Sequence, residues 1–224
     1  MRKIYLSAHP DDAVLSCGGL IFDDSMEGVQ SEVWTFMCGC AKDVPKEHFE
    51  TRIEEDFLAV RSLGAKPVHF GYLDALYREK MDGSKLYGGV FSHLDPQDTG
   101  TIESISKMIY LNNEEGDKFM CPLAVGDHVD HVIVRRALEL LHLPTTYYTD
   151  FPYIEYVPEK LDQAVEGLAK YPVTVSTEGL KNWIEAACMY KSQNLYPTQE
   201  ITRQKIKEYW APINGIFLWK ASEQ

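Results

Sequence analysis

Two short clusters of histidine and aspartate are the residues of this chain whose types and spacing could do chemistry. The first is His9-Pro10-Asp11-Asp12, and the second, far downstream, is Asp127-His128-Val129-Asp130-His131. Together they supply three imidazoles and four carboxylates. That set is sufficient for a metal ion with three protein ligands and an open position, together with a separate acid and base. The clusters therefore predict metal-assisted acid–base chemistry if the fold brings them together.

The surrounding pattern predicts a fold that does so. A strand-like run over residues 3–8 ends at the first cluster, and residues 119–125 run into the second. Helix-like segments follow at 12–27 and 132–141. Strands that alternate with helices in this way favour a parallel sheet with helices on both faces. Because such a sheet carries its chemistry beyond the carboxyl ends of its strands, both clusters should project from one edge.

The rest of the chain continues the alternation. We expect further strands at residues 31–37, 67–72, 145–149, 173–176 and 215–220, and helices at 46–63, 101–111, 158–170, 178–193 and 198–209. These elements predict an α/β fold with a Rossmann-like, mostly parallel sheet, in a single domain over residues 1–224.

Two helices carry packing signals. In the helix over 46–63, the spacing of Phe49, Ile53, Phe57 and Val60 predicts one buried face. In the helix over 12–27, Gly18-Gly19 would weaken the helix and suggests close packing against the sheet.

The first cluster has the geometry of a ligand pair. Pro10 fixes its own φ and favours an extended His9, so the chain can turn from strand to helix there. His9 and Asp12, which are three residues apart, can then face one point, and imidazole and carboxylate are good zinc ligands. Asp11 cannot easily point the same way, so it stays free to take a proton from water. Alone, this sequence could equally be a turn followed by a carboxylate helix cap.

The second cluster does not show which of its histidines would bind a metal. His128 and His131 are also three residues apart, so one could bind the metal while the other faces the substrate. Asp130 could orient an imidazole from behind. An isolated His-x-x-His is weak as a metal motif, and only the joint occurrence of two clusters after two predicted strands favours a site.

Composition excludes other classes. The formal net charge is −12, which argues against a nucleic-acid binder. No apolar run approaches the roughly 20 residues that span a bilayer, and no secretory leader pattern opens the chain. Five cysteines without a Cys-x-x-Cys pair favour reduced thiols and a cytoplasmic protein. Whether the chain forms a homo-oligomer is left open.

The motifs resemble those of a known family. Ala8-His9-Pro10-Asp11-Asp12, Gly18-Gly19 and Gly126-Asp127-His128-Val129-Asp130-His131 are similar to the zinc-dependent N-acetylglucosaminyl deacetylases of the PIG-L/LmbE-like family. Further landmarks are Arg52-x-Glu54, Leu63-Gly64, Asp74, Lys181 and Tyr190-Lys191-Ser192-Gln193. Two positions depart from the family pattern: Ala13 replaces a usual Glu, and Val129 a common Pro.

The resemblance implies an activity and a set of roles. The protein would remove an acyl group, usually acetyl, from the amine of a glucosamine-type sugar or glycoconjugate, with one Zn²⁺ per chain. The implied zinc ligands are His9, Asp12 and His131. The implied catalytic groups are Asp11 as general base, His128 as oxyanion stabiliser or proton donor to the leaving amine, and Asp130 as support for a histidine. Arg52 and Asp74 would hold the sugar.

Two other classes of protein fit the sequence less well. A non-catalytic sugar-binding module with a relic metal site gains some support from Ala13, but every chemically active residue is present. A dinucleotide-dependent enzyme is excluded because no Gly-x-Gly-x-x-Gly follows the first strand. We expect residues 75–100 and 150–160 to form the rim that selects the substrate, and one ring of the aromatic run over 147–153 could stack on a sugar.

Overall fold

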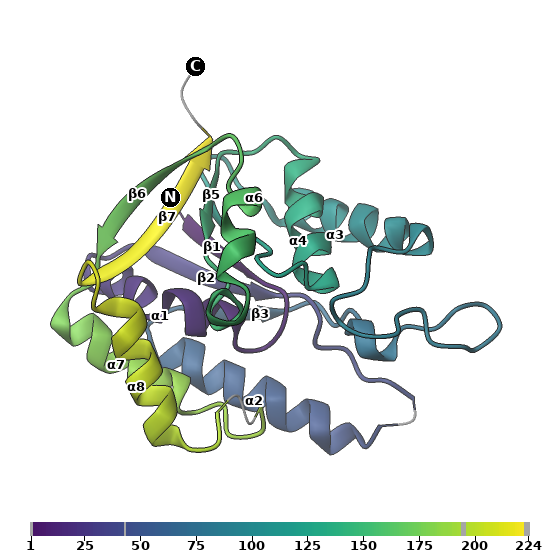
Figure 1. Ribbon diagram of the computed structural model, residues 1–224, viewed down its shortest axis with the longest axis horizontal. Helices are drawn as coiled ribbons and strands as arrows, with labels where there is room; N and C mark the ends of the chain where they lie inside the picture. Colours follow the sequence, from purple (N-terminus) through teal and green to yellow (C-terminus); the bar gives the residue numbers. More distant parts are fainter. Residues whose placement is uncertain (1, 43, 194–195, 222–224) are drawn as a thin grey trace.

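One seven-stranded sheet organises the protein. The computed structural model describes residues 2–42, 44–193 and 196–221. The strand order is β3-β2-β1-β4-β5-β7-β6 (Figure 1). The strands are β1 Arg2–Ser7, β2 Gln30–Thr35, β3 Lys66–His69, β4 Lys118–Pro122, β5 Thr145–Tyr148, β6 Leu168–Thr174 and β7 Gly215–Ala221. Strands β1 to β5 pair in parallel, whereas β7 is antiparallel to both β5 and β6. The expected mostly parallel α/β fold is confirmed.

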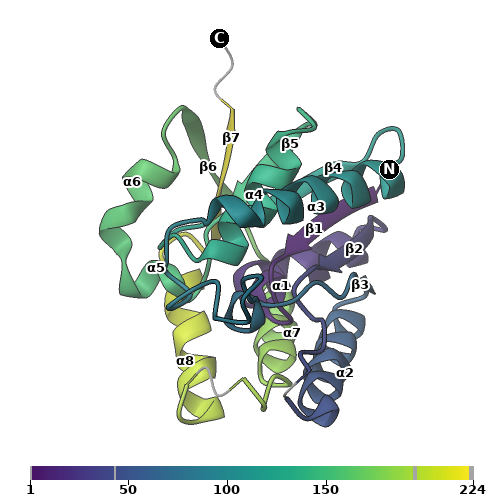
Figure 2. The same cartoon turned by 90° about the vertical axis from the view of Figure 1, so that its right-hand side faces the viewer.

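Helices cover both faces of the sheet. They are α1 Asp12–Met26, α2 Lys46–Ser62, α3 Thr99–Asn112, α4 Val129–Glu139, α5 Tyr153–Tyr156, α6 Leu161–Ala164, α7 Thr177–Ala187 and α8 Gln199–Trp210. Figure 2 shows α3 and α4 on one side of the sheet and α1, α2, α7 and α8 on the other. Each side has its own buried hydrophobic cluster. Among the described residues, no helix is long and apolar enough to cross a membrane.

Helix α4 begins earlier than the sequence indicated. The prediction started it at residue 132, after the second cluster, but it starts at Val129. The reason is a cap: His128 Nδ1 accepts a hydrogen bond from the backbone N–H of Asp130 at 3.2 Å. Asp130 and His131 therefore lie in the first turn of a helix, not in a loop.

The C-terminal third differs most from the prediction. The helix predicted over 158–170 was wrong beyond Ala164, because a short 3₁₀ turn at Pro158–Lys160 and α6 give way to strand β6. Gly167 has φ +75°, a left-handed conformation that ends the turn and admits the strand. Along its whole length β6 pairs with β7, a partner more than 40 residues further along the chain. This non-local pairing outweighs the local helical pattern.

Two packing predictions need correction. Gly18 and Gly19 meet α7 and the chain before it, not the sheet: a Cβ on Gly18 would lie 2.3 Å from Trp183 Cδ1, and one on Gly19 2.4 Å from Val175 Cγ1. On α2, Phe57 is 45% exposed, whereas Asp56 is buried. Asp56 turns inward because Thr35, His69 and Tyr190 donate hydrogen bonds to it.

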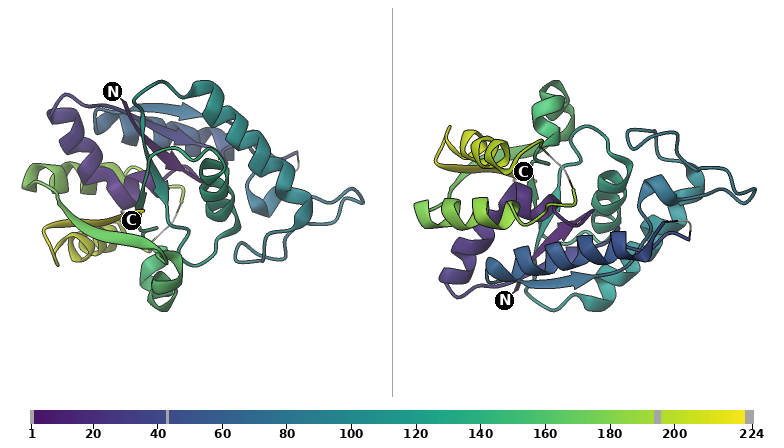
Figure 3. Two further views of the ribbon diagram at one scale, coloured as in Figure 1. Left: turned by 90° about the horizontal axis from the view of Figure 1, so that it is seen from above. Right: turned by 90° about the horizontal axis from the view of Figure 1, so that it is seen from below.

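The connection between β3 and α3 is the longest without a helix of α type. It contains the 3₁₀ turns Ala75–Tyr77 and Pro96–Asp98, and part of it extends away from the sheet in both views of Figure 3. Its first turn begins beside the carboxyl end of β1, where the connections after β1 and β4 diverge. Ligands bind at this point in open α/β sheets.

Candidate metal centre

The candidate site lies at the carboxyl ends of three adjacent strands. His9 follows β1, the cluster that includes His131 follows the neighbouring β4, and Asp150 follows β5, the next strand in the sheet. The turn after β1 is held by Ser7, whose hydroxyl donates to the carbonyl of His9 at 2.7 Å and accepts from the backbone N–H of Ala13 at 3.1 Å. The fold therefore brings the two sequence clusters together.

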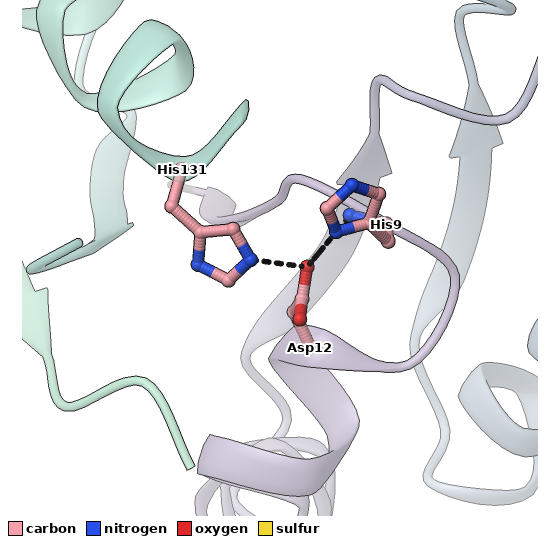
Figure 4. Close-up of side chains that lie close together, drawn as sticks. All are labelled: His9, Asp12 and His131. Atoms are coloured by element: carbon pink, nitrogen blue, oxygen red, sulfur yellow. Dashed lines mark hydrogen bonds and ion pairs between the residues drawn. The ribbon is translucent and has the colours of Figure 1, made fainter. Parts of the chain in front are cut away.

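Asp12 lies between two imidazoles. Its Oδ2 is 3.2 Å from His9 Nδ1 and 3.3 Å from His131 Nε2 (Figure 4). One potential ligand atom from each of the three side chains lies within 4.8 Å of the others. All three residues are at most 5% exposed. These are the three side chains that the sequence predicted as ligands, and they come from two segments far apart in the chain.

Each imidazole has a second carboxylate behind it. His9 Nε2 lies 2.9 Å from Asp130 Oδ2, and His131 Nδ1 lies 2.6 Å from Asp150 Oδ1. A carboxylate of this kind fixes the ring orientation and the tautomer of a metal-binding histidine. It leaves His9 Nδ1 and His131 Nε2 as the nitrogens that face Asp12.

His131 Nε2 is a buried nitrogen that lacks a proper partner. It is close to Asp12, but it makes no hydrogen bond of acceptable geometry to any described residue. A buried polar atom of this kind is costly unless something else engages it. Two imidazoles and one carboxylate form a donor set that suits zinc with an open coordination position. The residues present therefore fit a metal ion.

A second trio, His9, His128 and Asp130, also has the spacing of a metal site. Its atoms are already engaged. Asp130 accepts hydrogen bonds from the backbone N–H of Ala75 at 2.9 Å and from Arg78, and His128 Nδ1 accepts from Asp130 N. The first trio is therefore the better candidate.

The charges around Asp12 are strongly coupled. Burial lowers the pKa of His131, but Asp12 and Asp150 outweigh that effect and raise it to about 10. For His9 too, burial is outweighed by Asp12 and Asp130, so its pKa lies well above the usual range. Burial raises the pKa of Asp12, whereas both histidines lower it, and the net shift is downward. The trio therefore holds an ionised carboxylate at its centre.

His128 has the opposite character. Burial and the nearby charges of His9 and His131 lower its pKa to about 2, so it is neutral at physiological pH. Because Nδ1 accepts a backbone N–H, the proton of the neutral ring is on Nε2. Its ring centroid is 4.8 Å from that of His9 and 4.9 Å from that of His131. The arrangement can offer a neutral hydrogen-bond donor beside the trio.

Asp11 adjoins the trio without joining it. Its backbone has φ +124°, a conformation that a non-glycine residue adopts only at a cost. The side chain is buried, and its carboxylate accepts no hydrogen bond from the described part of the chain. Burial, then the charge of Asp12, raises the pKa of Asp11 well above its usual range. A free carboxylate with a raised pKa suits a proton acceptor.

Arg52 and Asp74, the residues predicted to hold a sugar, line one narrow cleft together with Pro10. Asp74 Oδ2 is 3.5 Å from His9 Nε2, and its other oxygen accepts from the backbone N–H of Leu76 at 2.8 Å. Among the described residues, no partner engages the buried Nε of Arg52. The fold therefore places Asp74 beside His9 and Arg52 in the same cleft as Asp74, and their contact with a substrate stays a prediction.

Sequence reasoning missed Ser7, Arg78 and Asp150, and also Asp98, whose carboxylate lies 3.0 Å from the guanidinium of Arg78. Asp150 had a readable signal, because it follows a predicted strand as the two recognised clusters do. Arg78 and Asp98 had none, because they lie in a segment without periodicity.

The fold and the site define a Rossmann-like α/β protein with a candidate histidine–aspartate metal centre at the switch point of its sheet. The family model described as PIG-L, GlcNAc-PI de-N-acetylase, matches residues 4–142, and the chain belongs to this family. The resemblance predicted from the sequence motifs is thus confirmed.

Known proteins are similar over much of the chain. The 2′-N-acetylparomamine deacetylase of Streptomyces fradiae is 27% identical over 164 residues, which cover 68% of this chain and 57% of the relative. The protein of the same name from Niallia circulans is 27% identical over 192 residues, covering 67% and 66%. This chain therefore aligns with less than two thirds of the length of either relative. The zinc-inhibited form of teicoplanin deacetylase shares the fold, with a TM-score of 0.81, 22% identity and full coverage of both chains.

Proposed function

We propose that this protein is a zinc-dependent hydrolase that removes an N-acetyl group from a glucosamine-type sugar or glycoconjugate. The observation that carries the proposal is the Asp12 carboxylate between His9 Nδ1 and His131 Nε2, with Asp130 and Asp150 behind the two rings. Membership of the de-N-acetylase family supports it. The names of the relatives, which are a 2′-N-acetylparomamine deacetylase and a teicoplanin deacetylase, agree with it.

In this proposal, His9, Asp12 and His131 hold the metal. When bound, the ion supplies Lewis-acid polarisation of the amide carbonyl and lowers the pKa of water. Asp130 and Asp150 keep the two imidazoles oriented, each through one hydrogen bond.

The neighbouring side chains move the protons. Asp11, whose pKa is raised, takes a proton from the attacking water. The neutral His128 donates a hydrogen bond from Nε2 to the developing oxyanion. The leaving amine needs a proton, which Asp11 can return after it has taken one from the water. His128, the other donor that the resemblance implied, has a pKa lowered to about 2 and so carries no additional proton to give at physiological pH. Arg52 and Asp74 would hold the sugar in the adjoining cleft.

The test combines metal analysis with amine release. Protein stripped with a chelator is reconstituted with zinc from 0.2 to several equivalents, and primary amine is measured over a panel of N-acetyl amino sugars. We expect activity to rise to one equivalent per chain. The structure of the similar teicoplanin deacetylase is of a zinc-inhibited form. The titration therefore continues beyond one equivalent of zinc, to test whether excess zinc lowers the activity.

Two results would count against the proposal. If sugars bind but no amine forms at any metal loading, the chain is a binding module, the alternative that the sequence left open. If His131→Ala retains full zinc stoichiometry, the ligand assignment is wrong. The cytoplasmic location expected from the sequence stays a prediction.

A further inference from the structure

An exposed aromatic ring lies beside His128. Phe91, in the connection between β3 and α3, is 59% exposed. Its ring centroid is 5.9 Å from that of His128 and 6.0 Å from that of Tyr153, and both pairs are nearly perpendicular. A large apolar side chain left in water at the edge of a polar site is a candidate contact for a ligand.

The position of Phe91 is fixed by its neighbours. The carbonyl of Val90 accepts a hydrogen bond from the backbone N–H of Val129 at 2.9 Å, which joins this segment to the first residue of α4. Gly126 lies beneath the aromatic pair: a Cβ there would be 3.9 Å from both Phe91 Cε1 and Tyr153 Cβ, and 3.1 Å from Val157 Cγ2. Phe91 is therefore exposed but held in place.

Tyr153 continues the apolar surface inward. Its ring centroid is 5.1 Å from that of His131 and 5.7 Å from that of His128. The two aromatic residues thus form a path from solvent to the metal trio. They come from residues 75–100 and 150–160, the two segments that the sequence predicted as the rim.

The depth of the trio determines which part of a substrate meets this path. His9, Asp12 and His131 are at most 5% exposed, so an amide carbonyl must enter deeply to reach them. The small acyl group enters first, and the body of the amino sugar remains at the rim. A pyranose ring presents C–H groups on its faces, and these pack well on an aromatic surface.

We propose that Phe91, supported by Tyr153, forms an aromatic platform for the pyranose ring that carries the scissile amide. The proposal rests on the deacetylase function proposed above and names the part of the substrate that is recognised. Phe91 is a specificity-determining residue in this view, whereas Arg52 on α2 and Asp74 are the residues expected to contact the polar groups of the sugar.

The experiment compares three amide substrates, two of which share an acetamide group. An N-acetylglucosamine glycoside carries the ring, N-acetylethanolamine lacks it, and an N-butyrylglucosamine glycoside has a longer acyl chain. Phe91→Ala should lower kcat/KM for the acetylated glycoside by roughly 3- to 10-fold, the range for one aromatic contact, and leave the acyclic amide unchanged. Phe91→Trp should retain activity. The control is Tyr110→Ala, an aromatic residue that is 68% exposed on α3.

Several outcomes would overturn the platform. An equal loss on glycoside and acyclic amide would mean that Phe91 acts through His128. A loss that grows with acyl length would place the acyl chain on the ring. No loss on any substrate would leave Phe91 without a role.

Failure of the proposed function is detected separately. Saturation-transfer NMR reports binding of the glycoside without turnover, and the melting temperature of each variant reports folding. If the wild type binds the sugar through its ring protons and releases no amine, and Phe91→Ala abolishes that contact, the platform stands and the deacetylase proposal falls.

Discussion

Arg78 forms a buried ion pair with Asp130, the same carboxylate that contacts His9 Nε2. The other end of the guanidinium lies 3.0 Å from Asp98 Oδ2, and its plane lies over Tyr87. Arg78 is only 8% exposed. One arginine thus connects the long segment between β3 and α3 to the back of the candidate metal centre.

Removing Arg78 should destabilise the protein. Arg78→Met leaves the buried carboxylates of Asp130 and Asp98 without their cation, and breaking one side of a buried pair costs about 3–5 kcal/mol in the free energy of unfolding. Urea denaturation measures the change. Arg203→Met, which removes an ion pair with a more exposed glutamate, should change stability by no more than about 0.5 kcal/mol. Similar values for both variants would show that Arg78 is not a structural link.

Asp150→Asn should weaken metal binding. The substitution keeps an oxygen near His131 Nδ1 but removes the negative charge that orients and polarises the ring. Loss of a partner of this kind lowers metal affinity by about 10- to 100-fold. Competition with a chromophoric chelator measures the affinity. Asp127→Asn is the matched control, because Asp127 is 60% exposed and pairs with Lys160. An unchanged affinity in Asp150→Asn would remove Asp150 from the centre.

Asp11→Asn should keep the metal and lose turnover. The carboxylate of Asp11 accepts no hydrogen bond from the described residues, and Asp11 belongs to neither candidate ligand trio, so the amide of Asn at this position should not disturb the ligands. Loss of a positioned proton acceptor lowers kcat by about 10²- to 10⁴-fold. Metal content and kcat are measured on one preparation, beside Asp127→Asn. Near-normal turnover in the metal-loaded variant would exclude Asp11 as the base.

Stability should depend on pH through Asp117. Burial raises the pKa of Asp117, but the hydrogen bonds from Arg2 and from the backbone N–H of Glu114 outweigh it, so the folded-state pKa lies below the unfolded one. The stabilisation is therefore fully present above the unfolded value of about 3.9 and is lost as pH falls through the folded value. Asp117→Asn should be less stable than the wild type at pH 7, and the gap should narrow at acid pH. A gap that widens toward acid pH would contradict the assignment.

Predictions from the sequence were most successful where chemically active residues directly follow a predicted strand. His9, Asp12 and His131 could be placed together because each cluster follows a strand of one parallel sheet. The partners behind them were harder to predict. Asp130 was expected to support a histidine, but only the fold shows that the ring is that of His9.

The parts that could not be predicted depend on long-range contacts. Strand β6 exists because β7 inserts between it and β5, and no local pattern indicates that pairing. Asp56 is buried through hydrogen bonds to residues of β2, β3 and the segment after α7. Arg78 lies in a segment whose composition indicates only a loop.

The segment that carries Arg78 and Phe91 is held by a few specific contacts, and a turn lies between two of them. Arg78 binds Asp130, Tyr87 donates a hydrogen bond to Asp98 at 2.7 Å, and Val90 binds Val129 through the backbone. Between Arg78 and Tyr87, the chain forms a turn in which the backbone N–H of Lys80 donates a hydrogen bond to the carbonyl of Ser84. The Met81 side chain in this turn is fully exposed. Loops grafted from other family members could therefore replace this turn without disturbing the candidate metal centre. A redesign of substrate specificity would best keep Arg78, Tyr87 and the backbone contact of Val90. It would vary the turn between Lys80 and Ser84 and the residue at position 91.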